Sequence, residues 1–476
     1  MDQTVDVVVL GGGPGGLSAA TSLALNDLKV AVVNDGHLMG YGIEGAFKSK
    51  AEFEIARQTA YTSLRQDLFG SPSAPDFGAV KRAIERAAKD LSWGIENRLE
   101  RLGIELVNGR GRFADDHSVV VGQDRIDAQH ILIATGSVPR VFPGVIVDGK
   151  RVLTSDEIVQ ISSLPESLLI LGAGVIGCEF ACIFNELGSR VQLVDTQERI
   201  LSTEDDDVSR FLARSFGLRG IDVLASCRFE GLEIGENGVR TELSTGQRVE
   251  TESVLFAVGR NAATAGLELD SAGVETDDRG YIPTGPDMKT NVPHIYAVGD
   301  VGHRNTPADM ALVHVAEAEG RCAANSILGR RSSQNLDHVP YIIFTIPMIA
   351  GAGLGETVAR ERFGDVRIGK YPYGRNHRAH AMFPPLGFVK LIVGPDGDDR
   401  ILGIRVVGRD ADSLVSAASI MIERGLPYTY ILDSILPHPS LMECLQGAAH
   451  IIAGDALGYE EGEEFLYSYL VEEGTG

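Results

Sequence analysis

Residues 7–16 read VVVLGGGPGG, and residues 168–177 read LLILGAGVIG. In each stretch an apolar run typical of a buried strand meets a glycine-rich turn, and a helix is expected to follow, through Leu25 and Leu187 respectively. A second strand-like run then ends in Asn34-Asp35 or in Asp195. The chain therefore contains two copies of a strand-turn-helix-strand unit, and the repetition argues against a chance match.

The glycine spacing in both units fits the fingerprint of dinucleotide-binding folds. The first glycine makes the tight turn, the second lets the backbone approach a pyrophosphate, and the third lets the helix pack closely on the strand. The positive N-terminus of the helix then faces the phosphates. The residues predicted to hold two nucleotides in this way are Gly11, Gly13, Pro14, Gly15 and Gly16 in the first unit, and Gly172, Gly174 and Gly177 in the second.

The residue at the end of each unit is expected to contact the ribose of the bound nucleotide. Asp195 places a carboxylate where it suits a free 2′-hydroxyl, and no basic pair follows at once to hold a 2′-phosphate, so NAD(H) is preferred over NADP(H). In the first unit the matching position is Asn34, followed by Asp35. Either residue is a candidate for the ribose contact, and the sequence does not separate them.

Composition excludes several classes of function. The 476 residues carry a net charge of −23, a sign that repels nucleic acids and anionic membranes. No apolar stretch reaches the ~18 residues that span a bilayer, and no signal peptide precedes residue 5, so a cytoplasmic protein is expected. The five cysteines, Cys178, Cys182, Cys227, Cys322 and Cys444, have no metal-type spacing, and no metal site is predicted.

Further motifs give the chain a resemblance to the pyridine nucleotide-disulfide oxidoreductases over almost its whole length. Residues 133–137 (IATGS) and 257–260 (AVGR) resemble two strands that connect the domains of that family. Residues 290–300, which end in YAVGD, resemble its second flavin motif. Residues 344–347 and 353–356 resemble the start of its dimerisation domain.

The resemblance implies an α/β fold with two Rossmann-like domains, for FAD and NAD, and an α+β C-terminal dimerisation domain. Residues 1–152 and 282–335 would bind FAD, residues 153–281 NAD, and residues 336–458 would form a homodimer, followed by an acidic tail at 459–476. Asp300 would hold the ribityl chain of FAD. The other cofactor contacts expected from the resemblance are Gly111, Thr135, Gly136, Gly259 and Ala311.

The redox-active cysteine pair of that family is missing. The family has Cys-x4-Cys before Pro-Ser-Lys, at the start of a helix against the flavin, whereas residues 41–50 read YGIEGAFKSK. Tyr41 and Ala46 stand at the two sulfur positions, and neither can form a mixed disulfide or act as a thiolate. Dithiol chemistry is therefore disfavoured.

Other residues of the expected site are retained. Lys50 matches a lysine near flavin N5, and Glu179 matches its ion-pair partner beside the nicotinamide, which fits hydride transfer from NADH to FAD. His438 and Glu443 resemble a histidine that the second subunit supplies as acid and base, and the glutamate that orients it. Tyr41 is either a proton donor beside the flavin or an aromatic that fills the gap.

These observations predict a homodimeric FAD-dependent NAD(P)H oxidoreductase that passes electrons from flavin directly to a small non-disulfide acceptor, such as a quinone or another conjugated organic compound. Nicotinamide transhydrogenation is an alternative that needs no dithiol. Two alternatives remain: a nucleotide-binding subunit without turnover, and a redox-inert acid-base enzyme.

Overall fold

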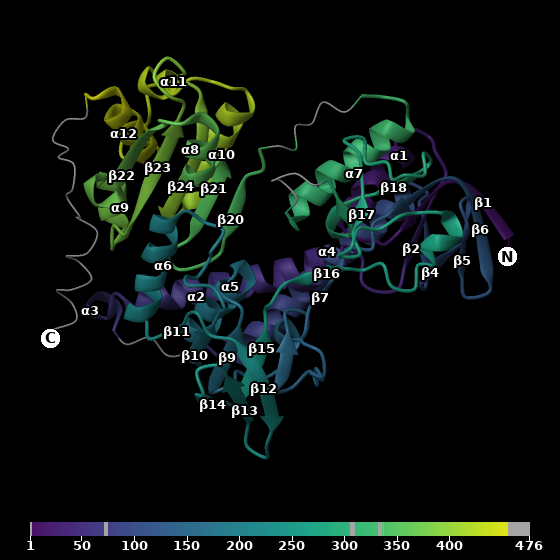
Figure 1. Cartoon of the computed structure of the whole chain (residues 1–476), viewed down its shortest axis with the longest axis horizontal. Coiled ribbons are helices and arrows are strands. Elements are labelled where there is room, and N and C mark those ends of the chain that lie inside the picture. The colour runs from purple at the N-terminus through teal and green to yellow at the C-terminus, as the bar shows by residue number, and fades with distance from the viewer. Residues whose placement is uncertain (1, 71–74, 305–309, 332–335, 337, 456–476) are drawn as a thin grey trace. The chain divides into compact units, whose positions relative to one another are not determined.

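The computed structural model describes residues 2–70, 75–304, 310–331, 336 and 338–455, so the predicted acidic tail lies outside the described residues. The chain divides into two compact units, and Figure 1 labels the elements of both. The first comprises residues 1–55, 73–164 and 255–337, and the second comprises residues 56–72, 165–254 and 338–476. Each unit is described by itself below, and α2 (Lys48–Ser63) and β15 (Ser253–Phe256) contribute residues to both.

The first unit contains the first glycine turn. Its strands are β1 (Asp2–Leu10), β2 (Val30–Asn34), β3 (Glu105–Asn108), β4 (Gly111–Asp115), β5 (Ser118–Val121), β6 (Asp124–Ile133), β7 (Ser137–Pro139), β8 (Val152–Thr154), β16 (Arg260–Ala262), β17 (Ile282–Pro283), β18 (Ile295–Ala297) and β19 (Gly302–His303). Its helices are α1 (Pro14–Ala24), α4 (Phe77–Arg101) and α7 (Val313–Ile327), with a π-helical turn η1 at Gly42–Phe47 and 3-10 turns η2 (Ile158–Gln160), η3 (Leu269–Ala272) and η4 (Gly299–Val301).

The main sheet of this unit has the strand order β3-β2-β1-β6-β5-β4, and β18 pairs with β6 beyond the end of β5. β1, β2, β3, β6 and β18 are parallel, as βαβ connections require. Alternate residues of β1 serve opposite faces: Val7 and Val9 pack in the cluster with α1 and α7, whereas Val8 and Leu10 pack in the cluster with β4 and β5. Burial on both faces explains the unbroken apolar run at residues 7–10.

The second unit contains the second glycine turn and the C-terminal region. Its strands are β9 (Ser167–Leu171), β10 (Arg190–Val194), β11 (Asp222–Leu224), β12 (Phe229–Ile234), β13 (Val239–Leu243), β14 (Arg248–Thr251), β20 (Tyr341–Ile343), β21 (Ile349–Gly353), β22 (Arg367–Pro372), β23 (Gly387–Val393) and β24 (Ile401–Gly408). Its helices are α3 (Gln66–Phe69), α5 (Val175–Leu187), α6 (Asp206–Leu218), α8 (Glu356–Phe363), α9 (His377–Met382), α10 (Ala411–Glu423), α11 (Thr429–Leu432) and α12 (Met442–Ala453), with a 3-10 turn η5 at Tyr373–Arg375.

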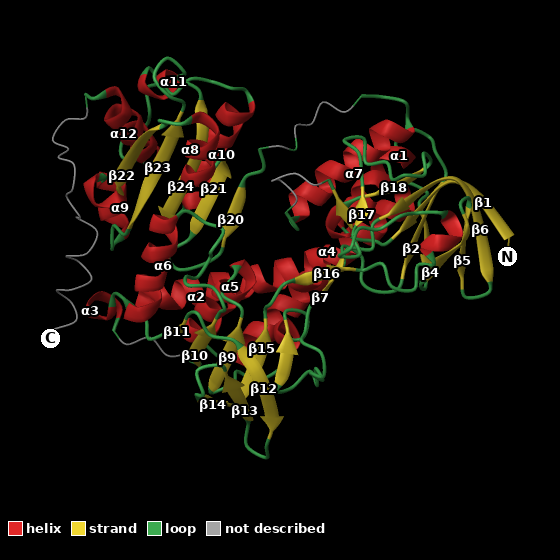
Figure 2. Cartoon of the chain, in the orientation of Figure 1, coloured by secondary structure: helices red, strands yellow, loops and turns green. Residues whose placement is uncertain are grey.

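Two kinds of sheet occur in this unit (Figure 2). β9, β10 and β11 are parallel and carry α5 after the glycine turn, as the sequence predicts. β20, β21, β24, β23 and β22 form an antiparallel sheet in that order. The α/β class and the α+β C-terminal region are confirmed. Among the described residues, no helix is both long and apolar enough to cross a membrane.

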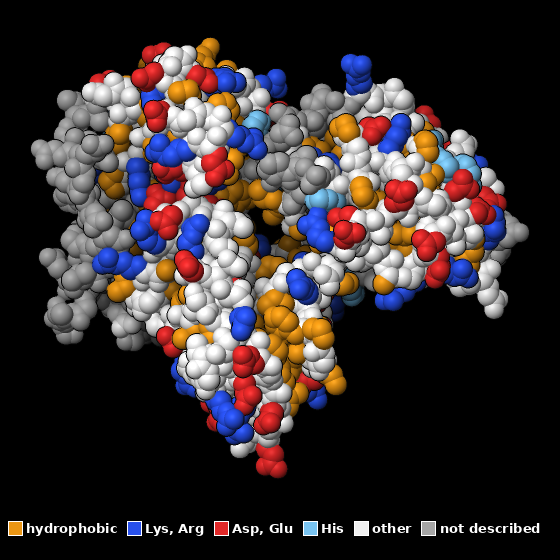
Figure 3. Space-filling view, viewed as in Figure 1, with side chains coloured by type: hydrophobic (Ala, Val, Ile, Leu, Met, Phe, Trp, Pro, Cys, Tyr) orange, Lys and Arg blue, Asp and Glu red, His pale blue; other side chains and the backbone are white. Residues whose placement is uncertain are grey.

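The predicted elements of both repeats agree with the structure to within a residue or two. The first helix ends at Ala24 with Leu25 as its C-cap, and the second ends at Leu187. The segments predicted as connecting strands lie between longer strands and the short strands β7 and β16, which pair with each other. Acidic and basic side chains are interspersed on the visible face of each unit, without a single large basic patch (Figure 3).

A buried ionic cluster joins the two parts of the second unit. Lys390 on β23 is 1% exposed, and its Nζ lies 2.8 Å from Asp205 Oδ2, 2.6 Å from Asp207 Oδ1 and 3.3 Å from Glu356 Oε2. Burial acts to lower the pKa of Lys390, but Asp207 and Asp205 raise it above its usual value. The lysine therefore stays charged, and it ties the start of α6 to the C-terminal sheet.

We expect Lys390→Met to lower the free energy of unfolding by about 3–5 kcal/mol, because the substitution leaves the buried carboxylate of Asp205 without its cation. Lys370 is the matched control: its Nζ lies 2.9 Å from Asp207 Oδ2, but its side chain is 35% exposed, so Lys370→Met should cost less than about 1 kcal/mol. Urea unfolding at pH 7 measures both. Equal midpoints for the two variants would show that the cluster does not join these segments.

Candidate functional site

The first glycine turn has the geometry that a nucleotide pyrophosphate needs. Gly11 has φ +109°, and a Cβ there would lie 2.3 Å from the carbonyl oxygen of Ala134. At Gly16 a Cβ would lie 2.2 Å from the Gly11 carbonyl oxygen, which explains the close packing of α1 on β1. Helix α1 begins with Pro14 after Gly13, and Gly13 offers no side-chain cap to the first N–H groups. This helix end therefore presents backbone donors and a positive dipole to an anion.

The second turn repeats this arrangement. A Cβ at Gly177 would lie 1.8 Å from the Gly172 carbonyl oxygen, so only glycine fits there. A Cβ at Gly174 would meet nothing within 4 Å, which leaves room for a phosphate beside the N-terminus of α5. The two turns thus fit the two nucleotides predicted from the sequence.

Asn34 at the end of β2 and Asp195 after β10 each accept a hydrogen bond from the backbone of the neighbouring glycine turn. Asn34 Oδ1 accepts a hydrogen bond from Gly12 N at 3.0 Å, and Asp195 Oδ2 accepts one from Ala173 N at 2.5 Å. Asp35 instead pairs with Arg110, at 2.5 Å. Of the two candidates that the sequence left open, Asn34 is therefore the one whose geometry matches Asp195.

Several predicted flavin contacts gather at the carboxyl end of β6 in the first unit. Thr135 Oγ1 is buried and has no hydrogen-bond partner among the described residues, which fits a contact with a bound molecule. Asp300 Oδ2 accepts a hydrogen bond from Ser137 Oγ at 2.6 Å. The other predicted contacts in this unit lie in turns or at strand and helix starts: Gly111 begins β4, Gly136 precedes β7, Gly259 precedes β16, and Ala311 precedes α7.

The segment that replaces the cysteine pair forms the π-helical turn η1. Tyr41 is its N-cap, and Lys48 N donates hydrogen bonds to the carbonyl oxygens of Gly45 and Ile43. The bond to Ile43 spans five residues, and a proline at position 48 could not donate it. The turn therefore depends on the loss of the proline that the family segment carries.

The side chain of Lys48 also stabilises this turn. It is almost fully buried, and its Nζ lies 2.7 Å from Glu44 Oε2 and 2.6 Å from Glu85 Oε1. Burial acts to lower the pKa of Lys48, but the hydrogen bonds that its Nζ donates to Glu44 and Glu85 raise it. Glu44 belongs to the turn and Glu85 to α4, so the ion pairs fix the turn on that helix.

The ring of Tyr41 lies between Gly45 and an arginine that the sequence analysis did not select. A Cβ at Gly45 would lie 2.1 Å from a ring carbon of Tyr41, and the Arg260 guanidinium carbon lies 4.3 Å from the ring centroid. Arg260 is held in place by Ser137, with Nε 2.7 Å from Ser137 Oγ, and by Asp156 at 3.1 Å. Because Ser137 also bonds Asp300, the network connects Tyr41 to a predicted flavin residue.

The five cysteines do not replace the missing pair. All are buried, and none forms a disulfide. Burial raises the pKa of Cys182 to about 12 and that of Cys178 well above its usual value. Such thiols are protonated at neutral pH and are poor nucleophiles.

Lys50 and Glu179 belong to different units. Lys50 lies in the first turn of α2, and Glu179 lies on α5, 5% exposed, where its Oε1 accepts a hydrogen bond from Phe344 N at 2.9 Å. Glu179 lies two residues after Gly177, the last glycine of the second motif. The predicted ion pair between the two residues stays a prediction.

His438 and Glu443 are brought together as predicted. His438 Nδ1 lies 2.8 Å from Glu443 Oε1, and Ser440 N donates to Glu443 Oε2 at 2.8 Å. Burial acts to raise the pKa of Glu443, but the Ser440 bond and His438 lower it, so this carboxylate stays ionised at neutral pH. His377 Nδ1 lies 3.4 Å from His438 Nε2, a contact between residues 61 positions apart that the sequence did not predict.

Comparison with known families agrees with this geometry. The model of the pyridine nucleotide-disulphide oxidoreductases matches residues 5–320, and the model of their dimerisation domain matches residues 339–449. Together these matches cover both glycine turns, the π-helical turn and the His438 segment.

Relatives and solved structures of similar length are numerous. A dihydrolipoyl dehydrogenase of Chlamydia muridarum is 33% identical over 452 residues, which is 93% of this chain and 96% of the relative, and that of Bacillus subtilis is 31% identical over 454 residues, 93% of this chain and 97% of the relative. LpdA from Mycobacterium tuberculosis has a TM-score of 0.86 at 26% identity, and the HOCl-induced flavoprotein disulfide reductase RclA from Escherichia coli, in a Cu(II) complex, has 0.85 at 26%. Both alignments cover 94% of this chain and 99% of the solved chain.

The two glycines of the second turn give a matched pair of variants. Gly174→Ala should fold normally but weaken NADH use by ~10²-fold, because its methyl group occupies the space in which a phosphate must approach. Gly177→Ala should lower the thermal unfolding midpoint, because its methyl group collides with backbone. Thermal unfolding and the KM for NADH test both. An unchanged KM in Gly174→Ala would remove this turn from the nucleotide site.

Proposed function

Because this chain belongs to the pyridine nucleotide-disulphide oxidoreductase family, we propose that it oxidises NADH and reduces a non-disulfide acceptor, such as a quinone or another conjugated organic compound, directly from its flavin. Membership makes the chain an FAD-dependent oxidoreductase that uses NAD(P). The acceptor, the preference for NADH and a cytoplasmic location belong to the proposal.

One observation carries the proposal: the segment at residues 41–46 has a tyrosine and an alanine where a dithiol relay needs two sulfurs. The π-helical turn, its buried Lys48 and the contact between Tyr41 and Arg260 hold the segment in place without sulfur atoms. Burial raises the pKa values of Cys178, Cys182 and Cys444, so none of these three thiols offers a thiolate in their place. A family member built in this way must pass electrons from flavin to its acceptor without a disulfide.

When bound, FAD supplies the chemistry of accepting a hydride and passing on two electrons. The first glycine turn and the N-terminus of α1 would hold its pyrophosphate, Asn34 its adenine ribose and Asp300 its ribityl chain. Thr135 supplies a buried hydroxyl for the same ligand. Lys50 and Glu179 are proposed to flank the place where nicotinamide and flavin meet.

Asp195, the residue that follows β10, favours NADH over NADPH. Both oxygens of Asp195 are held by backbone donors, Ala173 N at 2.5 Å and Gln197 N at 2.8 Å, so the carboxylate is fixed beside the second turn. A ribose 2′-hydroxyl can donate to such an oxygen, whereas a 2′-phosphate would be repelled by it.

A proton donor is required in addition to the hydride. Reduction of a quinone takes up two electrons and two protons, and NADH delivers two electrons with one proton. We propose that His438 of the second subunit supplies the other proton, with Glu443 holding its ring. The match to the dimerisation domain supports the homodimer that this role needs.

Tyr41 is proposed to form a wall of the acceptor site. Its ring is held between Gly45 and Arg260, and this fixed position favours a rigid wall over a mobile acid. Ala46 leaves the second sulfur position small. We propose that the acceptor lies against these two side chains.

Anaerobic stopped-flow mixing tests the function. NADH should bleach the flavin absorbance rapidly, with no long-wavelength thiolate-flavin band, and mixing with a benzoquinone should restore the absorbance while lipoamide should not. Reoxidation by lipoamide would contradict the proposal. Reoxidation by a nicotinamide analogue in place of quinone would favour transhydrogenation, and failure to bleach with NADH or NADPH would favour a binding subunit or an acid-base enzyme.

His438→Ala should leave flavin reduction by NADH unchanged and slow quinone turnover by about 10²–10⁴-fold, the range that general acid catalysis contributes. His450→Ala is the matched control, because His450 also pairs with a carboxylate, Asp455, at 2.9 Å. Single-turnover kinetics separate the two half-reactions. If His438→Ala and His450→Ala turn over quinone equally fast, His438 is not the proton donor.

A further inference from the structure

The topology of the first unit brings together two histidines that lie far apart in the sequence. β5 runs antiparallel to β6 and begins at Ser118, opposite Asp127, whereas β18 runs parallel to β6 and begins at Ile295, opposite Ile131. Both strands lie along the same edge of β6, so their first residues meet beside residues 128–130. His117 directly precedes β5 and His294 directly precedes β18. Their proximity therefore follows from strand pairing.

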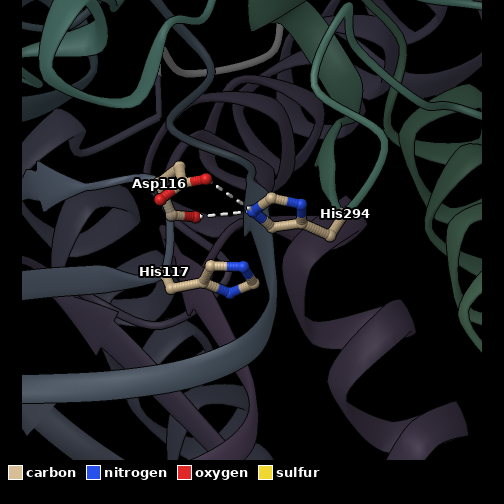
Figure 4. Close-up of side chains that lie close together, drawn as sticks. All are labelled: Asp116, His117 and His294. Atoms are coloured by element: carbon tan, nitrogen blue, oxygen red, sulfur yellow. Dashed lines mark hydrogen bonds and ion pairs between the residues drawn. The ribbon is translucent and has the colours of Figure 1, made fainter.

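The side chains at this junction are of metal-ligating types. The ligand atoms of Asp116, His117 and His294 all lie within 4.8 Å of one another. His294 Nε2 lies 2.8 Å from the Asp116 carbonyl oxygen and 3.8 Å from its Oδ2, and Figure 4 shows these oxygen atoms facing the His294 ring. The His117 ring stacks on that of His294, with centroids 3.9 Å apart and planes 2° apart.

A backbone contact prepares His117 for this role. Its Nδ1 lies 3.1 Å from the carbonyl oxygen of Ala128, which can only accept a hydrogen bond, so Nδ1 carries the proton. The Nε2 lone pair is then available to an ion. A backbone carbonyl that fixes the ring tautomer is the usual outer contact of a metal-binding histidine.

We propose that Asp116, His117 and His294 form a surface site for a divalent transition-metal ion, of the class of Zn²⁺ or Cu²⁺. Two imidazoles and one carboxylate favour such ions over Mg²⁺ and Ca²⁺, which prefer oxygen ligands. This inference is independent of the electron acceptor, because it rests on different residues.

Binding requires two small adjustments. The stacked rings are parallel, so one must rotate until both Nε2 lone pairs point at a single ion about 2.0–2.1 Å away. His117 is exposed and can turn about its side-chain bonds. His294 gives up the Nε2 hydrogen bond to the Asp116 carbonyl, its ring proton moves to Nδ1, and Asp116 Oδ2 supplies the third ligand.

A third histidine lies next to this site. His130 on β6 is opposite His294 in the strand register, and its Nδ1 is buried without a hydrogen-bond partner among the described residues. His130 is not one of the three proposed ligands.

Calorimetric titration of the FAD-loaded full-length enzyme with ZnCl2 at pH 7.5 tests the site. Other surface groups also bind Zn²⁺, so the measurement is the difference between variants. We expect His117→Ala/His294→Ala to lose one ion per chain, or to bind it ~10–100-fold more weakly, since even loss of an outer contact has that effect. Asp116→Asn should weaken the binding of the same ion to a smaller degree.

His450→Ala is the control, because it removes a histidine that faces a single carboxylate; it should keep the stoichiometry and affinity of the wild type. Thermal unfolding of each apo variant checks that the fold is unchanged. As a second measurement, the electron paramagnetic resonance spectrum with one equivalent of Cu²⁺ should show nitrogen coupling that the double variant loses. Identical titrations and spectra for wild type and the double variant would overturn the proposal.

Discussion

The contact between Gly177 and the Gly172 carbonyl oxygen is the constraint on which the nucleotide-binding fold depends. A Cβ at position 177 would lie only 1.8 Å from the Gly172 carbonyl oxygen. Helix α5 can therefore lie against its strand only with glycine at this position. The same contact in the first turn, between Gly16 and the Gly11 carbonyl oxygen, lets α1 lie close to β1. Because both helices are seated in this way, their N-termini point at the turns, and the residues that end β2 and β10 can bond the turn backbone.

The loss of the cysteine pair is one part of a larger change in the same segment. Lys48 in place of proline supplies the N–H that closes the π-helical turn, and its side chain supplies a buried cation. That cation requires carboxylates, which Glu44 and Glu85 provide, because a buried charge without partners costs several kcal/mol. Restoring two cysteines alone would therefore not restore the segment of a dithiol enzyme.

The sequence predicted the elements whose signals are local. Both strand-turn-helix-strand units, their glycines and the pairing of His438 with Glu443 come from residues close together in the chain, and the structure places them as expected. The role of Arg260 in holding Tyr41 was not predictable in the same way, because 219 positions separate the two residues and the contact depends on β7 pairing with β16. Asn34 and Asp35 illustrate a third case: the sequence left two candidates for the ribose contact, and the structure shows only that Asn34 bonds the turn backbone as Asp195 does.

The histidine pair at the edge of β6 shows why long-range sites escape sequence analysis. Metal motifs are recognised by short spacing, whereas His117 and His294 are separated by 177 positions and carry no shared motif. What places them together is the combination of an antiparallel and a parallel partner on one edge of β6, which begin opposite Asp127 and Ile131 and run in opposite directions from there. The predicted flavin contacts Asp300 and Thr135 follow the carboxyl ends of β18 and β6, whereas His294 precedes β18 and the pair lies beside residues 128–130 of β6. An ion there would act on the sheet and not on the reacting atoms.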